Sequence, residues 1–286
     1  MAWWRAVRLL LVTLAAVGVS ACAEATPPPT RHAATTARPD RSAHEAWALA
    51  VPQIATRGTA SRRAAIPILM YHVMSAAPPG APLPQLWVSQ RRFASEMVAL
   101  RGAGYHAITL ATAMLAWRHG GPLPHRPIVI SFDDGYRSDY THARPVLRRL
   151  GWPAVLNLVL QNVGPGGVTA REVRGLIASG WEIDSHTLTH PDLTTLPSGV
   201  LRHELVGSRA EIQRRFRQPA DFFCYPSGRY DARVEAAVRA AGYRAATTED
   251  EGYAMAAQGF ALKRIRVNGA DSAATLLTRL SEERPG

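Results

Sequence analysis

The chain has 286 residues and a formal net charge of +11, and 47% of its residues are hydrophobic. This composition is typical of a globular protein and leaves room for one domain of roughly 200–250 residues with extra segments. Only two cysteines occur, Cys22 and Cys224, which excludes a disulfide framework. The positive charge favours anionic surroundings such as phospholipid or acidic cell-wall polymers. Because no zinc finger, basic helix or aromatic-basic RNA signature accompanies it, we expect no nucleic-acid partner.

The N-terminus has the features of an export signal. Arg5 and Arg8 precede a mostly apolar run at residues 9–19, which is too short to span a bilayer as a mature helix. The following "VSAC" resembles a bacterial lipoprotein cleavage box. We therefore expect residues 1–21 to be a lipoprotein signal peptide and Cys22 to become a lipidated N-terminus at the membrane of the cell envelope. The alternatives are an ordinary signal peptide and an uncleaved anchor, and all three place the domain outside the cytoplasm.

The next segment, residues 22–62, predicts a disordered tether. It is rich in Ala, Thr, Pro and Arg and cannot bury a core. A short helix at residues 43–50 would interrupt it. The folded domain is then expected to cover residues 63–286.

From residue 66 onward, short apolar runs alternate with helical patterns. Strands are predicted at residues 66–73, 106–110, 127–132, 154–160, 181–185, 221–225, 244–248 and 262–267. Helices are predicted at residues 89–105, 111–120, 169–180, 198–216 and 231–242, with another ending near 150 and one after 271. Ser89 and Asp231 are expected N-caps, and Thr169 with Glu172 forms a predicted capping box.

Repeated strand–helix alternation with nearly continuous apolar strands predicts an α/β fold with a parallel sheet covered by helices. Seven or eight units in about 220 residues favour a closed or nearly closed barrel. An open doubly wound sheet is the alternative. In both architectures, functional sites lie at the carboxyl ends of the strands.

The predicted strand ends carry a candidate metal site. Asp133 and Asp134 end one strand, and His186 and His190 follow another. Histidines four residues apart share one face of a helical turn, and two imidazoles with a carboxylate form a common zinc set. Asp134 is the natural third ligand, which leaves Asp133 beside the metal to accept a proton from water. A divalent cation would also explain why two carboxylates adjoin at the end of a buried strand.

Other strand ends add His72, Arg264 and Arg266 to the same predicted rim. An isolated H-x-x-x-H or Asp-Asp-Gly is a weak signal, since histidines pair by chance and Asp-Asp-Gly often forms a turn. Their combination at separate strand ends of an exported protein is much more specific. Cys224 is expected to be a buried apolar thiol.

Two motifs resemble those of the polysaccharide deacetylase family, carbohydrate esterase family 4, with its NodB homology domain. "SFDDG" at 131–135 resembles the family's TFDDG, and "HTLTH" at 186–190 resembles its H-[ST]-x-x-H. The resemblance spans residues 66 to about 280. It implies a distorted (β/α)7 barrel that hydrolyses N-acetyl or O-acetyl groups on a polysaccharide. It also implies the ligands Asp134, His186 and His190 for a divalent metal, zinc first, with Co, Ni or Mn as substitutes, and Asp133 as the catalytic base.

The family's third motif, R-x-P-[YF], is altered. "CYPSG" places Cys224 at the arginine position and Ser227 at the aromatic position. The resemblance implies oxyanion or substrate contacts at Tyr225 and Ser227, the latter through its backbone N–H. Arg264 is expected to replace the missing guanidinium that orients the base.

The position of the catalytic acid also differs. The family usually supplies it from a Leu-x-His near the C-terminus, but no histidine follows His203. "ILMYH" near the N-terminus instead resembles the circularly rearranged subgroup that includes biofilm poly-N-acetylglucosamine deacetylases. In that interpretation His72 is the acid.

The leading hypothesis is a metal-dependent amidase acting on N-acetylglucosamine units of an exopolysaccharide or of peptidoglycan, working as a monomer. An O-acetyl esterase on a polysaccharide is the alternative within the enzymes. A non-catalytic glycan-binding lipoprotein is the alternative outside them, although all the expected site residues are present. A serine hydrolase is disfavoured because no G-x-S-x-G elbow occurs.

Overall fold

The computed structural model describes residues 56–285. Cys22, the predicted signal peptide and the predicted short helix at 43–50 lie outside the described residues. Within residues 56–285 the chain forms eight strands: β1 (Ile68–Tyr71), β2 (His106–Ile108), β3 (Pro127–Asp134), β4 (Val155–Leu158), β5 (Glu182–Ser185), β6 (Phe222–Cys224), β7 (Ala245–Glu251) and β8 (Leu262–Arg266). The predicted strands all appear, most of them shorter by one or two residues at an end, while β3 and β7 extend beyond the predicted carboxyl ends.

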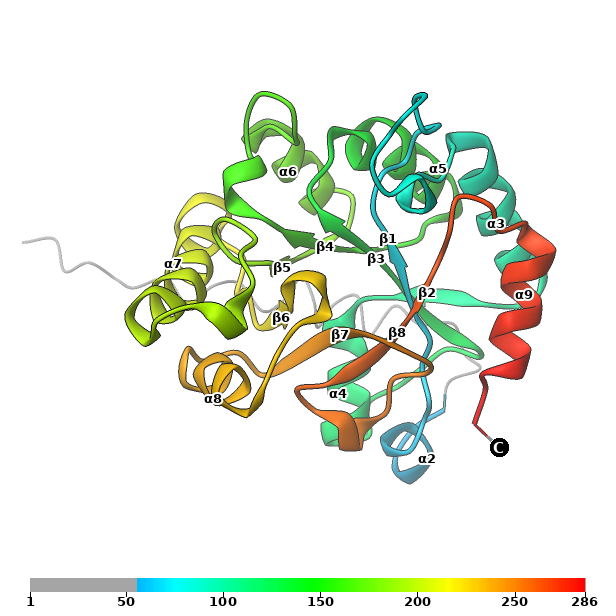
Figure 1. The fold of residues 1–286 in the computed structure, drawn as a ribbon. Helices are drawn as coiled ribbons and strands as arrows, with labels where there is room; N and C mark the ends of the chain where they lie inside the picture. Colours follow the sequence, from blue (N-terminus) through cyan, green and yellow to red (C-terminus); the bar gives the residue numbers. More distant parts are fainter. Residues whose placement is uncertain (1–55, 286) are drawn as a thin grey trace, which may run out of the picture. The chain divides into compact units, whose positions relative to one another are not determined.

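Seven of these strands close into a parallel barrel. Their order is β1-β8-β7-β6-β5-β4-β3, and β3 pairs back with β1 (Figure 1). The remaining strand, β2, pairs with the first residues of β3, beside the ring. The prediction of a distorted (β/α)7 barrel is therefore confirmed, and the open doubly wound sheet is excluded.

Helices surround the barrel (Figure 1). They are α2 (Thr59–Arg62), α3 (Gln90–Gly102), α4 (Leu110–His119), α5 (Arg144–Leu150), α6 (Ala170–Ile177), α7 (Ser198–Phe216), α8 (Ala232–Ala240) and α9 (Ala273–Glu282). The predicted caps are confirmed: the Ser89 and Asp231 side chains accept from the N3 amides, and Thr169 with Glu172 forms both bonds of a capping box. In the described part of the chain, no helix combines the length and hydropathy of a membrane span.

The barrel interior is divided into an apolar and a polar half. Alternate residues of a strand point to opposite faces, so Val129 and Val155 point inward near the strand starts. They belong to one buried apolar cluster with Met114 and Trp117 of α4. Helix α4 therefore closes the amino-terminal end of the barrel. At the carboxyl end, the inward positions of the same strands are polar, and this is where the site lies.

The segment before β1 packs onto the barrel. Thr56 exchanges both backbone hydrogen bonds with Leu123 at 2.9 Å, and the buried Ser61 hydroxyl donates to the Thr56 carbonyl at 2.7 Å. Residues 56–62 were predicted as the end of the tether. The folded part of the chain thus reaches back at least to Thr56, because this short segment finds backbone partners that composition does not reveal.

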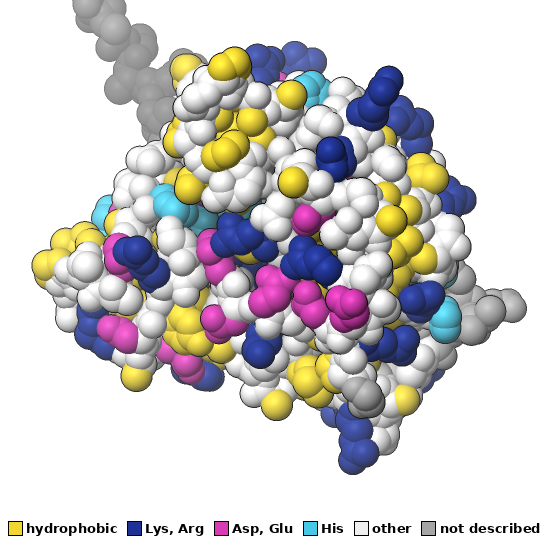
Figure 2. All heavy atoms as spheres, turned by 45° about the vertical axis from the view of Figure 1, so that its right-hand side comes forward, with side chains coloured by type: hydrophobic (Ala, Val, Ile, Leu, Met, Phe, Trp, Pro, Cys, Tyr) yellow, Lys and Arg dark blue, Asp and Glu magenta, His cyan; other side chains and the backbone are white. Residues whose placement is uncertain are grey.

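The net positive charge is not spread evenly over the surface. Figure 2 shows a face on which acidic side chains gather directly beside Lys and Arg side chains. Near the ends of β7 and β8, Arg266 pairs with Glu249, and Arg279 pairs with Glu251 and Asp271. This face therefore offers no continuous basic surface.

Candidate metal and catalytic site

The carboxyl ends of the barrel strands bring the predicted site residues together. Asp133 and Asp134 end β3, and His72 follows β1. His186 and His190 follow β5, while Arg264 lies in β8. The distances between their side chains define a metal half and a proton-transfer half.

The metal half consists of Asp134, His186 and His190. Asp134 Oδ1 lies 3.6 Å from Nε2 of each histidine, and the three ligand atoms lie within 4.8 Å of one another. His186 Nδ1 is 2.8 Å from the Cys224 carbonyl, which only accepts, so Nδ1 carries the proton and Nε2 keeps its lone pair. Tetrahedral zinc with bonds of about 2.0 Å separates its ligands by about 3.3 Å. The three residues therefore fit a divalent ion.

The loop that carries the two histidines is not the helical turn that their spacing predicts. Thr187 and His190 have left-handed φ values of 74° and 60°. Glu204 of α7 holds the loop, since its carboxylate accepts from the Leu188 and Thr189 amides at 2.8 and 3.0 Å. The prediction of a helical turn is wrong because these bonds replace those of a helix, yet the two imidazole rings still meet, with centroids 4.7 Å apart.

Backbone strain is also concentrated at the third ligand. Asp134 has φ 76°, a region that costs a non-glycine residue about 1–3 kcal/mol. Its backbone carbonyl accepts from Asn162 Nδ2 at 3.0 Å. Strain of this kind persists where surrounding contacts determine the backbone, and here it occurs at the residue whose carboxylate faces the two histidines.

The proton-transfer half is built on Asp133, which is 1% exposed. Its Oδ1 accepts from Arg264 Nη1 at 2.8 Å and from Asn157 Nδ2 at 2.7 Å. Its Oδ2 lies 3.8 Å from His72 Nε2. Burial opposes ionisation of Asp133, but the charge of Arg264, with smaller contributions from His72 and His186, lowers its pKa well below the usual range. Asp133 is therefore a buried carboxylate with one oxygen directed toward the site.

Two side chains orient this carboxylate. Arg264 is fully buried, and its Nε donates to the Thr248 carbonyl at 2.7 Å while Nη1 donates to Asp133. The predicted contact between Arg264 and Asp133 is therefore present. Asn157 was not predicted, although it is the one polar residue in the apolar run 154–160. Asn157 lies directly opposite Asp133 in the pairing of β3 with β4, and this register brings the two side chains into contact.

His72 lies near the other oxygen of Asp133, Oδ2, whereas Arg264 and Asn157 donate to Oδ1. It is 7% exposed, and burial lowers its pKa, opposed by the charges of Asp133 and Asp134. The imidazole therefore reaches the site from β1 without being a member of the metal set. Its role as the catalytic acid stays a prediction.

The two predicted residues of the third motif have different positions. Ser227 is exposed, with φ 51°, and its backbone N–H has no acceptor among the described residues. Tyr225 is fully buried, its ring stacks on Tyr230 at 4.6 Å, and its N–H donates to the Thr247 carbonyl. The prediction of a substrate contact for Tyr225 is therefore wrong, because strand alternation turns its ring outward into the core under α8.

Cys224 is buried, as predicted, and burial raises the pKa of its thiol. It also belongs to a second cluster of metal-ligating types, with Asp133 and His186. This cluster suits a metal less well than the first. A guanidinium already neutralises Asp133 at 2.8 Å, and the thiol would have to ionise in an apolar setting.

Replacing Arg264 by leucine is expected to lower the free energy of unfolding by about 3–5 kcal/mol, because it leaves the Asp133 charge buried without its partner. Chemical denaturation would measure this loss. Arg266→Leu on the same strand is the control. It removes a partly exposed ion pair with Glu249 and should cost less than about 1 kcal/mol. Equal losses in the two variants would contradict the structural role of Arg264.

The fold and the site define a (β/α)7-barrel protein with an Asp–His–His candidate metal set beside a buried aspartate. A family model described as polysaccharide deacetylase matches residues 120–246. The Bacillus subtilis protein YxkH, whose name describes it as a polysaccharide deacetylase, is 30% identical over 207 residues, which cover 72% of each chain. The chain belongs to the polysaccharide deacetylase family.

Solved structures agree with this assignment. The Streptococcus pyogenes deacetylase PplD superimposes with a TM-score of 0.72 at 25% identity, over 78% of this chain and all of that one. IcaB from Ammonifex degensii shares the fold, with a TM-score of 0.65 at 21% identity, over 75% and 96% of the two chains.

A short stretch is also similar to another curated protein. The Escherichia coli (strain K12) poly-β-1,6-N-acetyl-D-glucosamine N-deacetylase is 46% identical over 56 residues, which are 20% of this chain and 8% of that protein.

Proposed function

We propose that this protein is a metal-dependent deacetylase that removes N-acetyl groups from N-acetylglucosamine units of a cell-surface polysaccharide, either an exopolysaccharide or peptidoglycan. The observation that carries the proposal is the buried Asp133, paired with Arg264 and Asn157, next to the Asp134–His186–His190 set. Relatives named as poly-β-1,6-N-acetyl-D-glucosamine N-deacetylases support the choice of amide and sugar.

The residues divide the work of amide hydrolysis. Asp134, His186 and His190 would hold the divalent ion, for which we propose zinc. When bound, such an ion supplies Lewis acidity, which polarises the carbonyl and makes a coordinated water easier to deprotonate. The Ser227 backbone has a left-handed φ, and its N–H has no acceptor among the described residues. This N–H would donate to the carbonyl oxygen of the substrate amide, which becomes negative during the reaction.

Protons are moved by the other half of the site. Asp133 takes the proton of the attacking water on its Oδ2, because Oδ1 is already engaged by Arg264 and Asn157. The leaving nitrogen needs a proton, since an amide anion is a very poor leaving group. His72 Nε2 lies 3.8 Å from Asp133 Oδ2, and the charges of Asp133 and Asp134 favour its imidazolium form against the effect of burial. In that form His72 would give its proton to the leaving nitrogen and become neutral.

Metal content and acetate release test the proposal together. The purified protein is expected to hold about one zinc per chain and to release acetate from N-acetylglucosamine oligomers. A chelator should abolish release, and His186→Ala should lose both metal and activity. His203→Ala, which removes a histidine outside the metal set, is the control. Equal metal content in wild type and His186→Ala would contradict the metal set, and release from O-acetylated glycans alone would favour an esterase.

We also propose that the protein is tethered to the membrane of the cell envelope through a lipid on Cys22. The support is the short apolar run that ends in "VSAC". Cys22→Ser is expected to move the protein to the soluble fraction or to block its processing, as membrane fractionation would measure. Cys224→Ser, at a cysteine buried in the barrel, is the control and should fractionate as wild type. If Cys22→Ser also stays with the membrane, the tether is something other than a lipid on this residue.

A further inference from the structure

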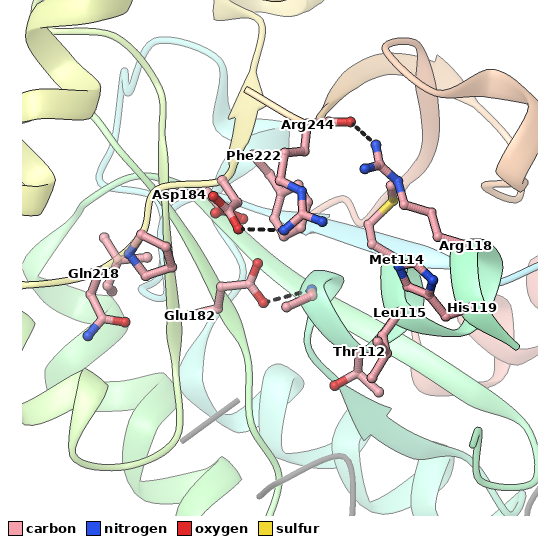
Figure 3. A pocket seen from close by; sticks show the side chains of 14 residues that line it. Thr112, Met114, Leu115, Arg118, His119, Glu182, Asp184, Gln218, Phe222 and Arg244 are labelled. Carbon is pink, nitrogen blue, oxygen red and sulfur yellow. Dashed lines mark hydrogen bonds and ion pairs between the residues drawn. The ribbon is translucent and has the colours of Figure 1, made fainter. Parts of the chain in front are cut away.

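Two recesses lie at the amino-terminal end of the barrel, away from the candidate metal site. Figure 3 shows the first, in which Glu182 and Asp184 of β5 lie opposite Leu115 of α4. Burial raises the pKa of Asp184 well above its usual range, and the charge of Glu182 and a hydrogen bond with it add to the effect. The two carboxyl groups of this recess therefore serve as partners of each other rather than of a ligand.

The second recess is a cavity of about 320 Å³ with a different charge. It lies where the segment before β1, the loop before β3, the turn between β7 and β8 and the residues after α9 meet. The residues proposed for catalysis and metal binding do not line it. The described residues of its lining include no Asp or Glu, but they include one histidine and three arginines: His125, Arg63, Arg126 and Arg284. The second recess is therefore cationic.

Arg126 is held at the wall of this recess by contacts that leave its charge unpaired. Its Nη1 donates to the Ala103 carbonyl at 2.7 Å, and its guanidinium lies over the ring of Tyr105, 4.6 Å from the centroid. A guanidinium has five N–H groups, so this one hydrogen bond leaves donors for a ligand. Arg126 is thus fixed in place without being neutralised.

Arg63 and Arg284 add two exposed guanidinium groups at the edge of the recess. Among the described residues, neither side chain forms a hydrogen bond or an ion pair. Burial raises the pKa of Tyr253, which also lines the recess, and the charges of Arg284 and Arg126 act against that shift. Both guanidinium groups therefore lie close enough to this tyrosine for their charges to act on it together.

The lining favours an anion with several oxygen atoms. Arginine side chains bind phosphate and carboxylate groups through paired N–H donors. Three arginines without a carboxylate match the nearly double negative charge of a phosphate monoester better than the single charge of a carboxylate. The cavity also has buried Leu123 and Tyr105 in its wall, which can contact the organic part of such an ester.

We propose that this recess is a binding site for a phosphate monoester, with the phosphate between Arg126 and Arg284 and the organic part against Leu123 and Tyr105. A soluble phosphate ester and a phospholipid headgroup share this chemistry. Thr56, the first described residue, lines the recess, so the N-terminal segment joins the fold beside it. The proposal depends neither on the reaction at the other end of the barrel nor on the lipid tether.

Calorimetric titration of the full-length protein with glycerol 1-phosphate tests the proposal. It should bind saturably at the recess, and at least about tenfold more tightly than glycerol or acetate. Dihexanoyl phosphatidic acid, used as a soluble monomer, presents the same phosphate as a lipid headgroup. Tighter binding of this lipid would assign the recess to a headgroup, and equal or weaker binding to a soluble ester. Absence of saturable binding by both, or equal affinity for acetate, would overturn the proposal.

Variants locate the site. Arg126→Gln and Arg284→Glu should each weaken binding of both phosphate compounds by at least about tenfold, and Arg284 is exposed, so its replacement does not disturb the core. Arg202→Glu makes the same charge change at an exposed position of α7 and should bind as wild type. Phosphate could also bind at the metal set, so His186→Ala is included and should keep its affinity. Unchanged binding in Arg126→Gln and Arg284→Glu, equal losses in Arg202→Glu and Arg284→Glu, or loss in His186→Ala alone would overturn the site.

Discussion

Replacing Asp133 by asparagine is expected to lower kcat for an N-acetylated oligosaccharide by about 10²–10⁴-fold while metal content stays at the wild-type level. Asparagine can still accept from Arg264 and Asn157 through its carbonyl oxygen, so the surrounding hydrogen bonds survive. The oxygen that faces the site becomes an amide nitrogen and can no longer take a proton from water. Acetate release, together with metal analysis of the same sample, measures both effects.

Asp139 offers a matched control for this substitution. It is fully buried in the segment that follows β3, and burial raises its pKa well above the usual range, with the charges of Asp134 and Asp133 adding to the effect. Burial therefore favours the neutral form of its carboxyl group, which asparagine resembles in shape and charge, and Asp139→Asn should leave kcat within about threefold of wild type. If Asp133→Asn loses its metal, or Asp139→Asn is as inactive as Asp133→Asn, Asp133 does not have the role of a base.

The parts of the site that follow from strand ends could be predicted from the sequence. Apolar runs mark the buried strands, and parallel strands all place their carboxyl ends at one rim. Asp133, Asp134 and His72 follow directly from that rule. Arg264 is different, since its position in β8 indicates the rim, whereas its hydrogen bond to Asp133 depends on how the barrel closes between β8, β1 and β3.

The sequence-based predictions that failed concern features that depend on tertiary contacts. The His186–His190 spacing predicts a helical turn, but Glu204, 14 residues beyond His190, binds the loop amides instead. Tyr225 belongs to a family motif, yet the strand alternation of β6 decides its direction and buries it. Asn157 was overlooked because a lone asparagine in an apolar run gives no local sign of its partner on the neighbouring strand.

The division of the barrel interior explains how a carboxylate remains charged inside this fold. The half near α4 is lined mainly by apolar side chains, and its buried Glu182 carboxylate accepts a hydrogen bond from the Ala111 amide of α4. In the other half, Arg264 enters from β8 and Asn157 from β4, and both donate to the same oxygen of Asp133. A buried charge is tolerated when it is both paired and hydrogen-bonded. That pairing leaves the second oxygen free of strong donors, which is the condition for a base.

His72→Ala is expected to slow amide hydrolysis by about 10²–10⁴-fold and to leave metal content unchanged. The nitrogen that leaves an amide must be protonated, and His72 Nε2 is the imidazole nitrogen near Asp133 Oδ2. A nitrophenyl acetate ester has a leaving group that needs no proton, so the variant should lose less than about tenfold with that substrate. Comparing kcat/KM of each enzyme on the two substrates separates loss of an acid from general damage to the site.

His142→Ala is the control for this comparison, because His142 lies on the segment after β3 and its Nδ1 contacts the Met74 carbonyl rather than Asp133. It should affect amide and ester equally and weakly. The ratio of kcat/KM for the amide to kcat/KM for the ester therefore tests whether His72 is the catalytic acid. If His72→Ala slows the ester as severely as the N-acetylated oligosaccharide with its metal intact, His72 supports the position of Asp133 rather than protonating the leaving amine, and the acid must come from another group.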